Sequence, residues 1–448
     1  MGWIGIPRVI ILGALSAMLL ATVPAAAAPT DDLLICEQAP GDVAIAACTR
    51  AIASGRYRGK DLAQLYDNRG VEYVNKGELD RAISDYNDAI RLDPNSARAY
   101  SNRGEAWRKK GELTRAISDH NEAIRLEPKF APFYYNRGLA FYDKRELERA
   151  IAEYNEAIGL DPKFAIAYNN RGLAWRDKGE LDRAIADFTE AIRLNPKYAR
   201  AYNNRGLVFY DKRELEQAIA EYNEAIRFDP KFAAAYYNRG RVWRAEGELD
   251  RAITDFNEAI RLDPKFAVAY YNRGTVWRDK GELDRAIADY TEVIRLYPKY
   301  DWAFLNRGLA YFYSGKPAAL ADVNQASELD PKNAYHALWA DIISQRNGLA
   351  SRLPQAIAKI DMTKWPAPVL RLSLGQSTPA AVLAAADDPD AKKKNEQVCQ
   401  ANFYSGIVAL RQGAKVKAAQ LFRLAADGCP RDFPESFAAN AELKQLGQ

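Results

Sequence analysis

A proline that recurs every 34 residues constrains the fold of this chain more than any other feature of its sequence. The triplet Asn-Arg-Gly recurs in step with it, and these prolines are Pro94, Pro128, Pro162, Pro196, Pro230, Pro264 and Pro298, with Pro331 after 33 residues. A fixed period of about 20 to 50 residues is typical of arrays in which each unit packs against its neighbours. The sequence therefore predicts eight repeats within residues 63–333, at about 63–96, 97–130, 131–164, 165–198, 199–232, 233–266, 267–300 and 301–333.

Each repeat has the hydrophobic spacing of two amphipathic helices. Positions are counted here from the first residue of a repeat, so that Ala97 is position 1. Aromatic residues stand at positions 4 and 11 and glycine stands at position 8, which places all three on one face of a helix. Position 15 is usually glycine, which suits the left-handed residue after a helix. The second helix carries alanine at 20 and 27 and an aromatic residue at 24, and the proline at 32 ends it.

This unit resembles the tetratricopeptide repeat (TPR), whose pattern is W-x2-L-G-x2-Y…A-x3-F…P over 34 residues. Tyrosine or phenylalanine replaces the tryptophan here, and arginine replaces the leucine beside the glycine. The resemblance implies an all-α fold, a right-handed superhelical solenoid of helical hairpins with a concave groove. Such arrays bind protein or peptide partners, and each repeat contacts mainly its neighbours.

The two ends of the array are expected to be helical as well. Residues 29–62 form an N-terminal cap, in which 42–52 aligns with the second helix at 80–90. Residues 334–448 form a C-terminal module with three helices near 399–412, 415–427 and 433–446, a charged linker at 387–394, and a degenerate repeat. This module resembles the C-terminal part of NlpI-type bacterial envelope adaptors, through Ala337–Trp339, Trp365, Leu374-Gly375, Asn402–Tyr404, Leu421–Ala425, Phe433-x-Glu435, Glu442-Leu443 and Leu446-Gly447. The resemblance implies cell-envelope hydrolases or a protease as partners.

The first 28 residues are typical of a signal peptide. Arg8 precedes an apolar run from Val9 to Val23, and Ala25–Ala28 supplies small residues for cleavage. We therefore expect a periplasmic or secreted protein whose mature chain has no membrane span, with a membrane anchor as the alternative. Because export permits disulfides, we expect Cys36 to pair with Cys48 and Cys399 with Cys429. In the second case, the start of one helix lies beside the end of the next. Four free buried thiols are the alternative.

Asparagine at position 6 and arginine at position 12 are the candidate peptide-binding residues. In the resembled family, position 6 faces the groove, where a carboxamide can donate to and accept from an extended backbone. Arginine suits an acidic peptide. The alternatives are bonding within the array for the asparagines and a solvated rim for the arginines. The candidates are Asn68, Asn102, Asn136, Asn170, Asn204, Asn238, Asn272 and Asn306, with Arg108, Arg176, Arg244 and Arg278.

Other polar residues favour structural roles. Position 7 is arginine and position 23 is acidic in every repeat, so pairs such as Arg103 with Asp119 are expected to stabilise the hairpin. His120 stands in the aromatic position 24, where a core residue is expected, and His336 has no second ligand nearby. No metal, cofactor or catalytic motif is present, and a net charge of +4 gives no reason to expect nucleic acid.

The sequence thus predicts an exported, non-catalytic scaffold that binds extended peptide segments in its groove. The first alternative is a structural homo-oligomer, such as a homodimer, assembled through the C-terminal module. The second is an enzyme whose chemistry lies within residues 334–448, although no convergent histidine, cysteine or carboxylate cluster is evident there.

Overall fold

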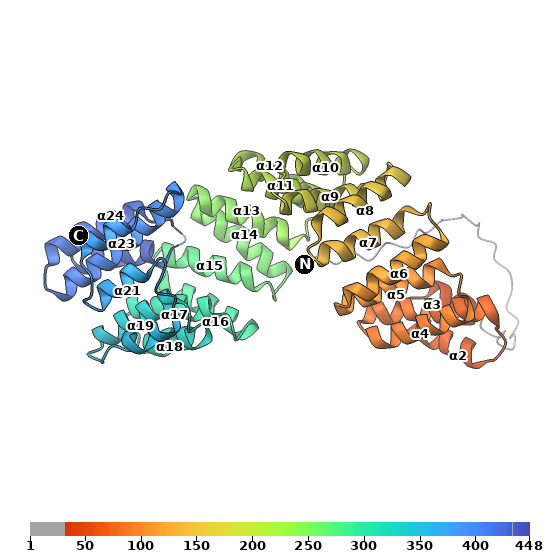
Figure 1. Ribbon diagram of the computed structural model, residues 1–448, viewed down its shortest axis with the longest axis horizontal. Helices are drawn as coiled ribbons and strands as arrows, with labels where there is room; N and C mark the ends of the chain where they lie inside the picture. Colours follow the sequence, from red (N-terminus) through yellow and green to blue (C-terminus); the bar gives the residue numbers. More distant parts are fainter. Residues whose placement is uncertain (1–31, 432) are drawn as a thin grey trace, which may run out of the picture. The chain divides into compact units, whose positions relative to one another are not determined.

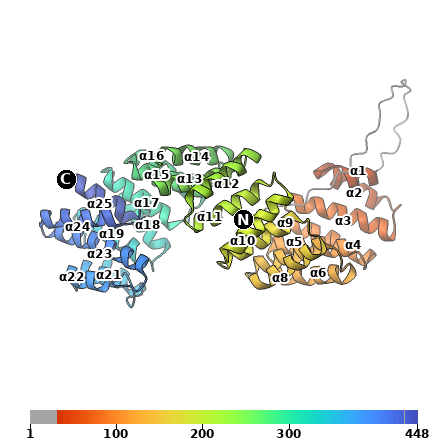
Figure 2. The same cartoon turned by 90° about the horizontal axis from the view of Figure 1, so that it is seen from above.

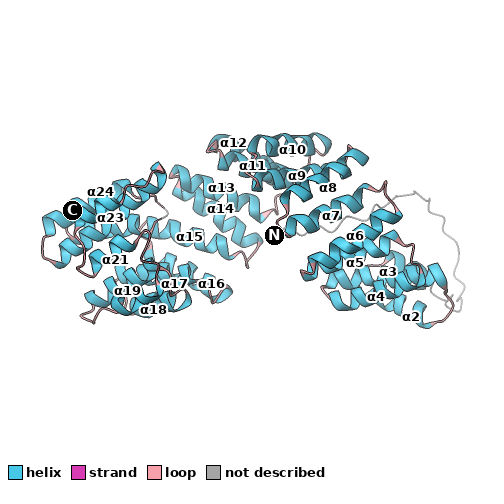
Figure 3. Cartoon of the chain, viewed as in Figure 1, coloured by secondary structure: helices cyan, strands magenta, loops and turns pink. Residues whose placement is uncertain are grey.

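The computed structural model describes residues 32–431 and 433–448, and every regular element within these ranges is a helix. Figure 1 follows the helices along the chain, and Figure 3 shows the same residues coloured by secondary structure. The all-α fold predicted from the 34-residue period is confirmed. The expected signal peptide at 1–28 lies outside the described residues. Within the described part of the chain, no helix is both long and apolar enough to cross a membrane.

Each of the eight repeats forms one helical hairpin. The first helices are α3 (Gly59–Lys76), α5 (Ala97–Lys110), α7 (Ala131–Asp143), α9 (Ala165–Asp177), α11 (Ala199–Asp211), α13 (Ala233–Glu246), α15 (Ala267–Asp279) and α17 (Asp301–Tyr313). The second helices are α4 (Leu79–Leu92), α6 (Leu113–Leu126), α8 (Leu147–Leu160), α10 (Leu181–Leu194), α12 (Leu215–Phe228), α14 (Leu249–Leu262), α16 (Leu283–Leu296) and α18 (Ala319–Leu329).

The chain divides into two compact units, one ending at Pro162 and the other beginning at Lys163. The first contains α1 (Asp32–Gln38), α2 (Gly41–Ala53) and the hairpins through α8, and α2 packs against α3 as a cap would. The second contains the hairpins from α9 to α18 and the C-terminal module. The helices of this module are α19 (Ala334–Arg346), α20 (Leu353–Ala356), a 3-10 turn (Ile357–Lys359), α21 (Ala367–Ser373), α22 (Pro379–Ala385), α23 (Ala391–Arg411), α24 (Lys415–Gly428) and α25 (Pro434–Gln445).

Close contact between the two helices of a hairpin depends on the glycine at position 8. A Cβ atom built on Gly172 of α9 would lie 2.8 Å from Cε1 of Phe188 in α10, which is closer than packed carbon atoms approach. Phe188 is fully buried. The aromatic side chain at position 24 therefore fills the space that the missing side chain at position 8 leaves, as the sequence pattern predicts.

Arginine at position 7 ties each hairpin together and also reaches the preceding one. In repeat 2, the Arg103 guanidinium donates to both carboxylate oxygens of Asp119 over 2.8 and 2.7 Å, and to Asn87 Oδ1 of repeat 1 over 2.7 Å. The pairing with position 23 occurs in all eight repeats, in Arg69–Asp85, Arg103–Asp119, Arg137–Glu153, Arg171–Asp187, Arg205–Glu221, Arg239–Asp255, Arg273–Asp289 and Arg307–Asp322. The structural role expected for these arginines is therefore observed.

The C-terminal module packs against the last repeats of its unit. Figure 2 shows its helices beside α17 and α19. Tyr313 Oη of α17 donates to Glu442 Oε1 of α25 over 2.9 Å, and Glu442 also pairs with Arg346 at 2.7 Å. The expected linker at 387–394 is partly wrong, because Asp390 caps α23 by accepting from the backbone N–H of Lys392 and Lys393, so the helix begins at Ala391.

Disulfides join Cys36 to Cys48 and Cys399 to Cys429, the two pairs expected from the sequence. The first links α1 to α2, and the second links the interior of α23 to the residue that follows α24. No free cysteine is present among the described residues. Each bond therefore fixes a hairpin at one end of the described chain.

Candidate peptide-binding cleft

Six of the asparagines at position 6 bond to the preceding repeat. In each of these the side-chain Nδ2 donates to position 5 of that repeat, 35 residues earlier in the sequence. The pairs are Asn102 to Asp67 (2.9 Å), Asn136 to Ser101 (3.2 Å), Asn204 to Asn169 (2.9 Å), Asn238 to Asn203 (2.9 Å), Asn272 to Tyr237 (3.3 Å) and Asn306 to Tyr271 (3.1 Å). The donor half of each carboxamide in this set is thus committed to the array.

The other two asparagines are also buried among polar neighbours. Asn68 accepts from Arg98 over 3.0 Å, and Asn170 accepts from Asn169 over 3.2 Å. Only 6% of the surface of Asn68 and 9% of that of Asn170 is exposed. Of the two interpretations that the sequence left open, bonding within the array is therefore the one that the geometry favours. Peptide binding by these asparagines stays a prediction.

The arginines at position 12 form a second set of contacts, directed toward the next repeat. Arg108 pairs with Asp143, Arg176 with Asp211 at 2.7 Å, and Arg244 with Asp279 at 3.7 Å. Each aspartate stands at position 13 of the following repeat. These three arginines are partly buried, so a ligand would meet them already paired.

Arg278 departs from the expected groove position. It is fully buried, pairs with Asp279 at 2.9 Å, and donates to Asn306 Oδ1 over 2.7 Å. Its guanidinium also lies 5.3 Å from the ring centroid of Phe437 in α25. The expectation that Arg278 faces a ligand is wrong, because the C-terminal module covers it.

A basic pocket opens between the first helices of repeats 5 to 7 and the C-terminal module. Its volume is about 890 Å³. Residues from α11, α13 and α15 line one side, and the start of α23 and residues 428–433 line the other. The charged side chains in its lining are Arg213, Arg241, Arg244, Lys392 and Arg431, with Glu396 as the one carboxylate among the described lining residues. The pocket therefore has a strong excess of positive charge.

Three of these arginines are not paired with any carboxylate among the described residues. Arg241 stacks on the ring of Tyr210, with 4.6 Å between the guanidinium carbon and the ring centroid. Arg431 lies against Gly247, where an added Cβ would come within 2.6 Å of Nη1. Arg213 is exposed. Guanidinium groups in this state are available for bidentate contacts with carboxylates.

The sequence analysis missed Arg213, Arg241 and Arg431, although two of them break the repeat pattern. Arg241 occupies position 9, where leucine is the commonest residue in the other repeats. Arg213 occupies position 15, where most repeats have glycine, and it adopts the left-handed backbone conformation with φ of 65°. A side chain in that conformation costs on the order of 1 kcal/mol. These departures were the signal that could have identified the pocket.

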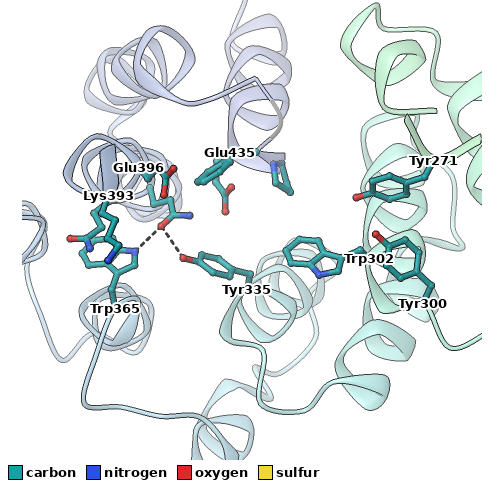
Figure 4. Close-up of a pocket in the computed structure, with 12 residues that line it drawn as sticks. Tyr271, Tyr300, Trp302, Tyr335, Trp365, Lys393, Glu396 and Glu435 are labelled. Carbon is teal, nitrogen blue, oxygen red and sulfur yellow. Dashed lines mark hydrogen bonds between the residues drawn. The ribbon is translucent and has the colours of Figure 1, made fainter. Parts of the chain in front are cut away.

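An aromatic pocket of about 510 Å³ adjoins the basic pocket, and Glu396 and Phe433 line both. It is lined by Tyr271, Tyr300, Trp302, Tyr335, Trp365, Lys393, Glu396, Gln397, Gln400, Phe433, Pro434 and Glu435. Figure 4 shows the aromatic side chains of the last repeats and α19 facing Glu396 and Glu435 of the C-terminal module. Gln400 Oε1 accepts from Trp365 Nε1 over 2.7 Å and from Tyr335 Oη over 2.9 Å, which fixes both rings.

Two carboxylates give the aromatic pocket a negative side. Glu435 is almost fully buried and accepts from Tyr404 Oη over 2.8 Å, and burial raises its pKa. Burial also raises the pKa of Tyr335, and the negative charges of Glu435 and Glu396 contribute to that shift. The two pockets together form a continuous cleft with a positive part and an aromatic, acidic part, which we call the two-part cleft.

The histidines do not contribute to the cleft. His120 is fully buried in the aromatic position 24, and burial lowers its pKa to about 3. His336 is also fully buried, with its ring centroid 5.2 Å from that of Trp302. Both lie in the core, as expected for His120. Within residues 32–431 and 433–448, no group of three or more histidine, cysteine, aspartate or glutamate side chains is arranged to hold a metal ion.

These observations define a helical-repeat protein with a ligand-sized cleft on its first-helix face. The profile described as TPR repeat matches residues 70–108, 104–144, 138–175, 172–213, 206–243 and 240–277, and that described as tetratricopeptide repeat matches 267–300. Together they span residues 70–300, more than half of the chain. The chain belongs to the tetratricopeptide repeat family, whose members are generally non-catalytic scaffolds suited to protein–protein interaction.

The chain is also similar to several solved structures. A tetratricopeptide repeat protein from Parabacteroides merdae ATCC 43184 is 21% identical with a TM-score of 0.46, over 55% of this chain and 98% of that chain. YrrB, described as a TPR protein with an unusual peptide-binding site, is 26% identical with a TM-score of 0.36, over 42% and 96%. Pseudomonas aeruginosa PilF is 22% identical with a TM-score of 0.41, over 46% and 95%.

Proposed function

We propose that this protein is an exported scaffold that binds an extended, acidic peptide segment of an envelope protein in the two-part cleft. The observation that carries the proposal is the set of arginines without carboxylate partners, Arg213, Arg241 and Arg431, in one pocket of about 890 Å³. Most arginines at positions 7 and 12 are neutralised within the array, so the positive charge in this pocket is exceptional. An acidic segment would neutralise it.

The pocket's size and position suit a peptide. A ligand there would contact Tyr210 and Asn272 of the repeats together with the start of α23. Tyrosine and arginine are enriched among residues that dominate binding energy at interfaces. The cleft is formed by two parts of the same compact unit, so the binding surface combines the TPR array with the C-terminal module.

Export is the second part of the proposal. Two disulfides are compatible with an oxidising compartment. The resemblance of residues 334–448 to NlpI-type adaptors supports partners in the cell envelope, such as a hydrolase or a protease. Purification of the native protein from cell fractions should yield a chain that begins between Ala26 and Thr30. An intact N-terminus on envelope-bound protein would contradict export by cleavage.

Binding is tested with a fluorescein-labelled peptide of four consecutive glutamates in a Gly/Ser background, and with the same peptide carrying lysines instead. We expect the wild-type chain to bind the acidic peptide, and the triple variant R213Q/R241Q/R431Q to bind it at least 10-fold more weakly. The single variant R285Q is a control, because Arg285 is exposed and stacks only on Trp277. Equal binding by the triple variant and the wild-type chain would overturn the proposal. A dimer in sedimentation that buries the cleft would favour the homo-oligomer.

A further inference from the structure

The aromatic pocket differs from the aromatic clusters in the rest of the array because no cation of the chain covers its tryptophans. Tryptophan at position 11 has an arginine over its ring in four repeats, with guanidinium carbon to centroid distances of 4.7 Å for Arg115 and Trp107, 4.7 Å for Arg183 and Trp175, 4.8 Å for Arg251 and Trp243, and 4.6 Å for Arg285 and Trp277. Among the described residues, no lysine or arginine lies in this way over Trp302 or Trp365.

The side chains around these rings leave space and negative charge for a cation. Trp302, Tyr335 and Trp365 are partly buried and line a cavity of about 510 Å³. Glu396 is partly buried and lies 3.9 Å from the exposed Lys392, the outer limit of an ion pair. Aromatic faces attract cations most strongly where water is excluded. A carboxylate beside such faces adds to this attraction.

Hydrogen bonds hold the aromatic rings in place before any ligand arrives. Gln400 fixes Trp365 and Tyr335, and Asn306 donates to Tyr271 Oη over 3.1 Å. Tyr271 and Tyr300 form an edge-to-face pair with 5.4 Å between centroids. A preorganised pocket loses less conformational freedom on binding than a flexible one. The pocket is thus built to accept a ligand group of fixed chemistry.

We propose that the aromatic pocket binds a cationic side chain, lysine or arginine, of the same peptide whose acidic residues occupy the basic pocket. This proposal rests on the proposed function in assigning the peptide, but the pocket's preference for a cation can be measured separately. Because Glu396 and Phe433 line both pockets, the two charged parts of the ligand lie close together in its sequence. The cleft would then recognise a pattern of opposite charges and not net charge alone.

The first experiment uses four fluorescein-labelled peptides, each with three glutamates followed by a lysine after one to four glycines. Each is compared with a peptide in which norleucine or glutamate replaces the lysine. We expect the lysine peptide to bind about 3- to 30-fold more tightly than the norleucine peptide at one spacing at least, which corresponds to the range of cation–π interactions. Equal affinities at all four spacings, with acidic binding retained, would overturn this inference and leave the proposed function intact.

Protein variants assign the preference to the pocket. E396Q and Y300A should reduce the advantage of lysine over norleucine at least 3-fold, and K393A should increase it, because Lys393 is an exposed cation in the lining. E216Q is the matched control for E396Q, since Glu216 is exposed on α12 and remote from the lining of both pockets. An unchanged preference in both E396Q and Y300A would place the lysine elsewhere and contradict the proposal.

The second experiment needs no acidic peptide. The protein is labelled with 5-fluorotryptophan, and the resonances of Trp302 and Trp365 are assigned with W302F and W365F. The labelled protein is then titrated with Nα-acetyl-lysine amide and with Nα-acetyl-norleucine amide. Shifts of these two resonances with the lysine compound alone support a cation site even if no acidic peptide binds. Shifts with both compounds, or with neither, would overturn it.

Discussion

Asn238 Nδ2 donates to Asn203 Oδ1 across 2.9 Å, so that two carboxamides in consecutive repeats bond to each other. Asn203 is buried with 5% of its surface exposed, and Asn238 with 7%. Asn203 also donates from its own Nδ2 to Asn204 Oδ1 over 3.4 Å. This relationship changes what a substitution at position 6 is expected to do.

We predict that N238A lowers the free energy of unfolding by about 1–2 kcal/mol, because the Asn203 oxygen loses its donor while it remains buried. Urea unfolding followed by circular dichroism measures the change. Q217A is the control, since Gln217 carries the same functional group on the exposed surface of α12. The double variant N203A/N238A should cost less than the sum of the single variants. Stability equal to that of Q217A would show that the bond contributes nothing.

G172A should lower the free energy of unfolding by roughly 1–3 kcal/mol, because its Cβ would overlap the buried ring of Phe188. The added F188L substitution should recover part of this loss by removing ring atoms near the new methyl group. G159A is the matched control, because Gly159 lies in helix α8 and a Cβ built on it would have no neighbouring atom within 4 Å.

At Gly159 the same substitution is expected to raise stability by about 0.5–1 kcal/mol, since alanine favours the helix over glycine. Thermal melting of both variants separates the two effects. A G172A variant as stable as G159A would contradict the close packing between positions 8 and 24.

His120 makes the first unit sensitive to acid. Its folded-state pKa of about 3 is lower than the ordinary 6.5, because burial and the charges of Arg108 and Arg137 disfavour the imidazolium. As the pH falls below 6.5, the unfolded state binds a proton that the folded state excludes, so stability is lost. Between pH 6.5 and pH 5 the loss is about 2 kcal/mol, at roughly 1.4 kcal/mol per pH unit.

H120F should abolish this contribution, because phenylalanine occupies the same position in Phe188 and Phe256. Unfolding free energies of the wild-type chain and H120F are compared at pH 7 and pH 5. Carboxylates titrate in both proteins, so their effects cancel in the difference. An identical pH dependence in the two proteins would show that His120 is protonated in the folded state or exposed in it.

Loss of the Cys399–Cys429 disulfide should weaken peptide binding as well as stability. The bond closes a loop with a sequence separation of 30 residues, which stabilises the chain by at most about 4 kcal/mol through the entropy of the unfolded state. Cys429 also lines the basic pocket. We expect C399A/C429A to bind the acidic peptide more weakly. C36A/C48A, in the other unit, should lose stability without a change in affinity. Equal affinities in both double variants would separate the disulfide from the cleft.

The sequence predicted the contacts that repeat. The pairing of Arg103 with Asp119 and the packing of Phe188 on Gly172 follow from residue types at fixed positions, so one repeat predicts the others. The partner of Asn238 was harder to identify, because its acceptor stands in a different repeat and varies in type from aspartate to serine, asparagine and tyrosine. A carboxamide that could serve a peptide can equally serve a neighbour.

The two-part cleft could not be predicted in the same way. Tyr271 and Trp365 lie in segments with no common period, and only the packing of the C-terminal module on the last repeats brings them to one pocket. The start of α23 was misplaced for a related reason. The run of lysines after Asp390 has the composition of a linker, but the Asp390 side chain caps a helix there.

The offset of 35 residues between position 6 and position 5 of the preceding repeat has an evolutionary consequence. Most repeats carry a donor for the repeat before them and, at position 5, a residue that can accept from the repeat after them. Recombination that removes or inserts one whole 34-residue unit among these therefore rejoins a donor to an acceptor. A deletion of any other length would leave buried amides without partners at the junction. Selection against such junctions would keep the number of units variable and the length of each unit constant.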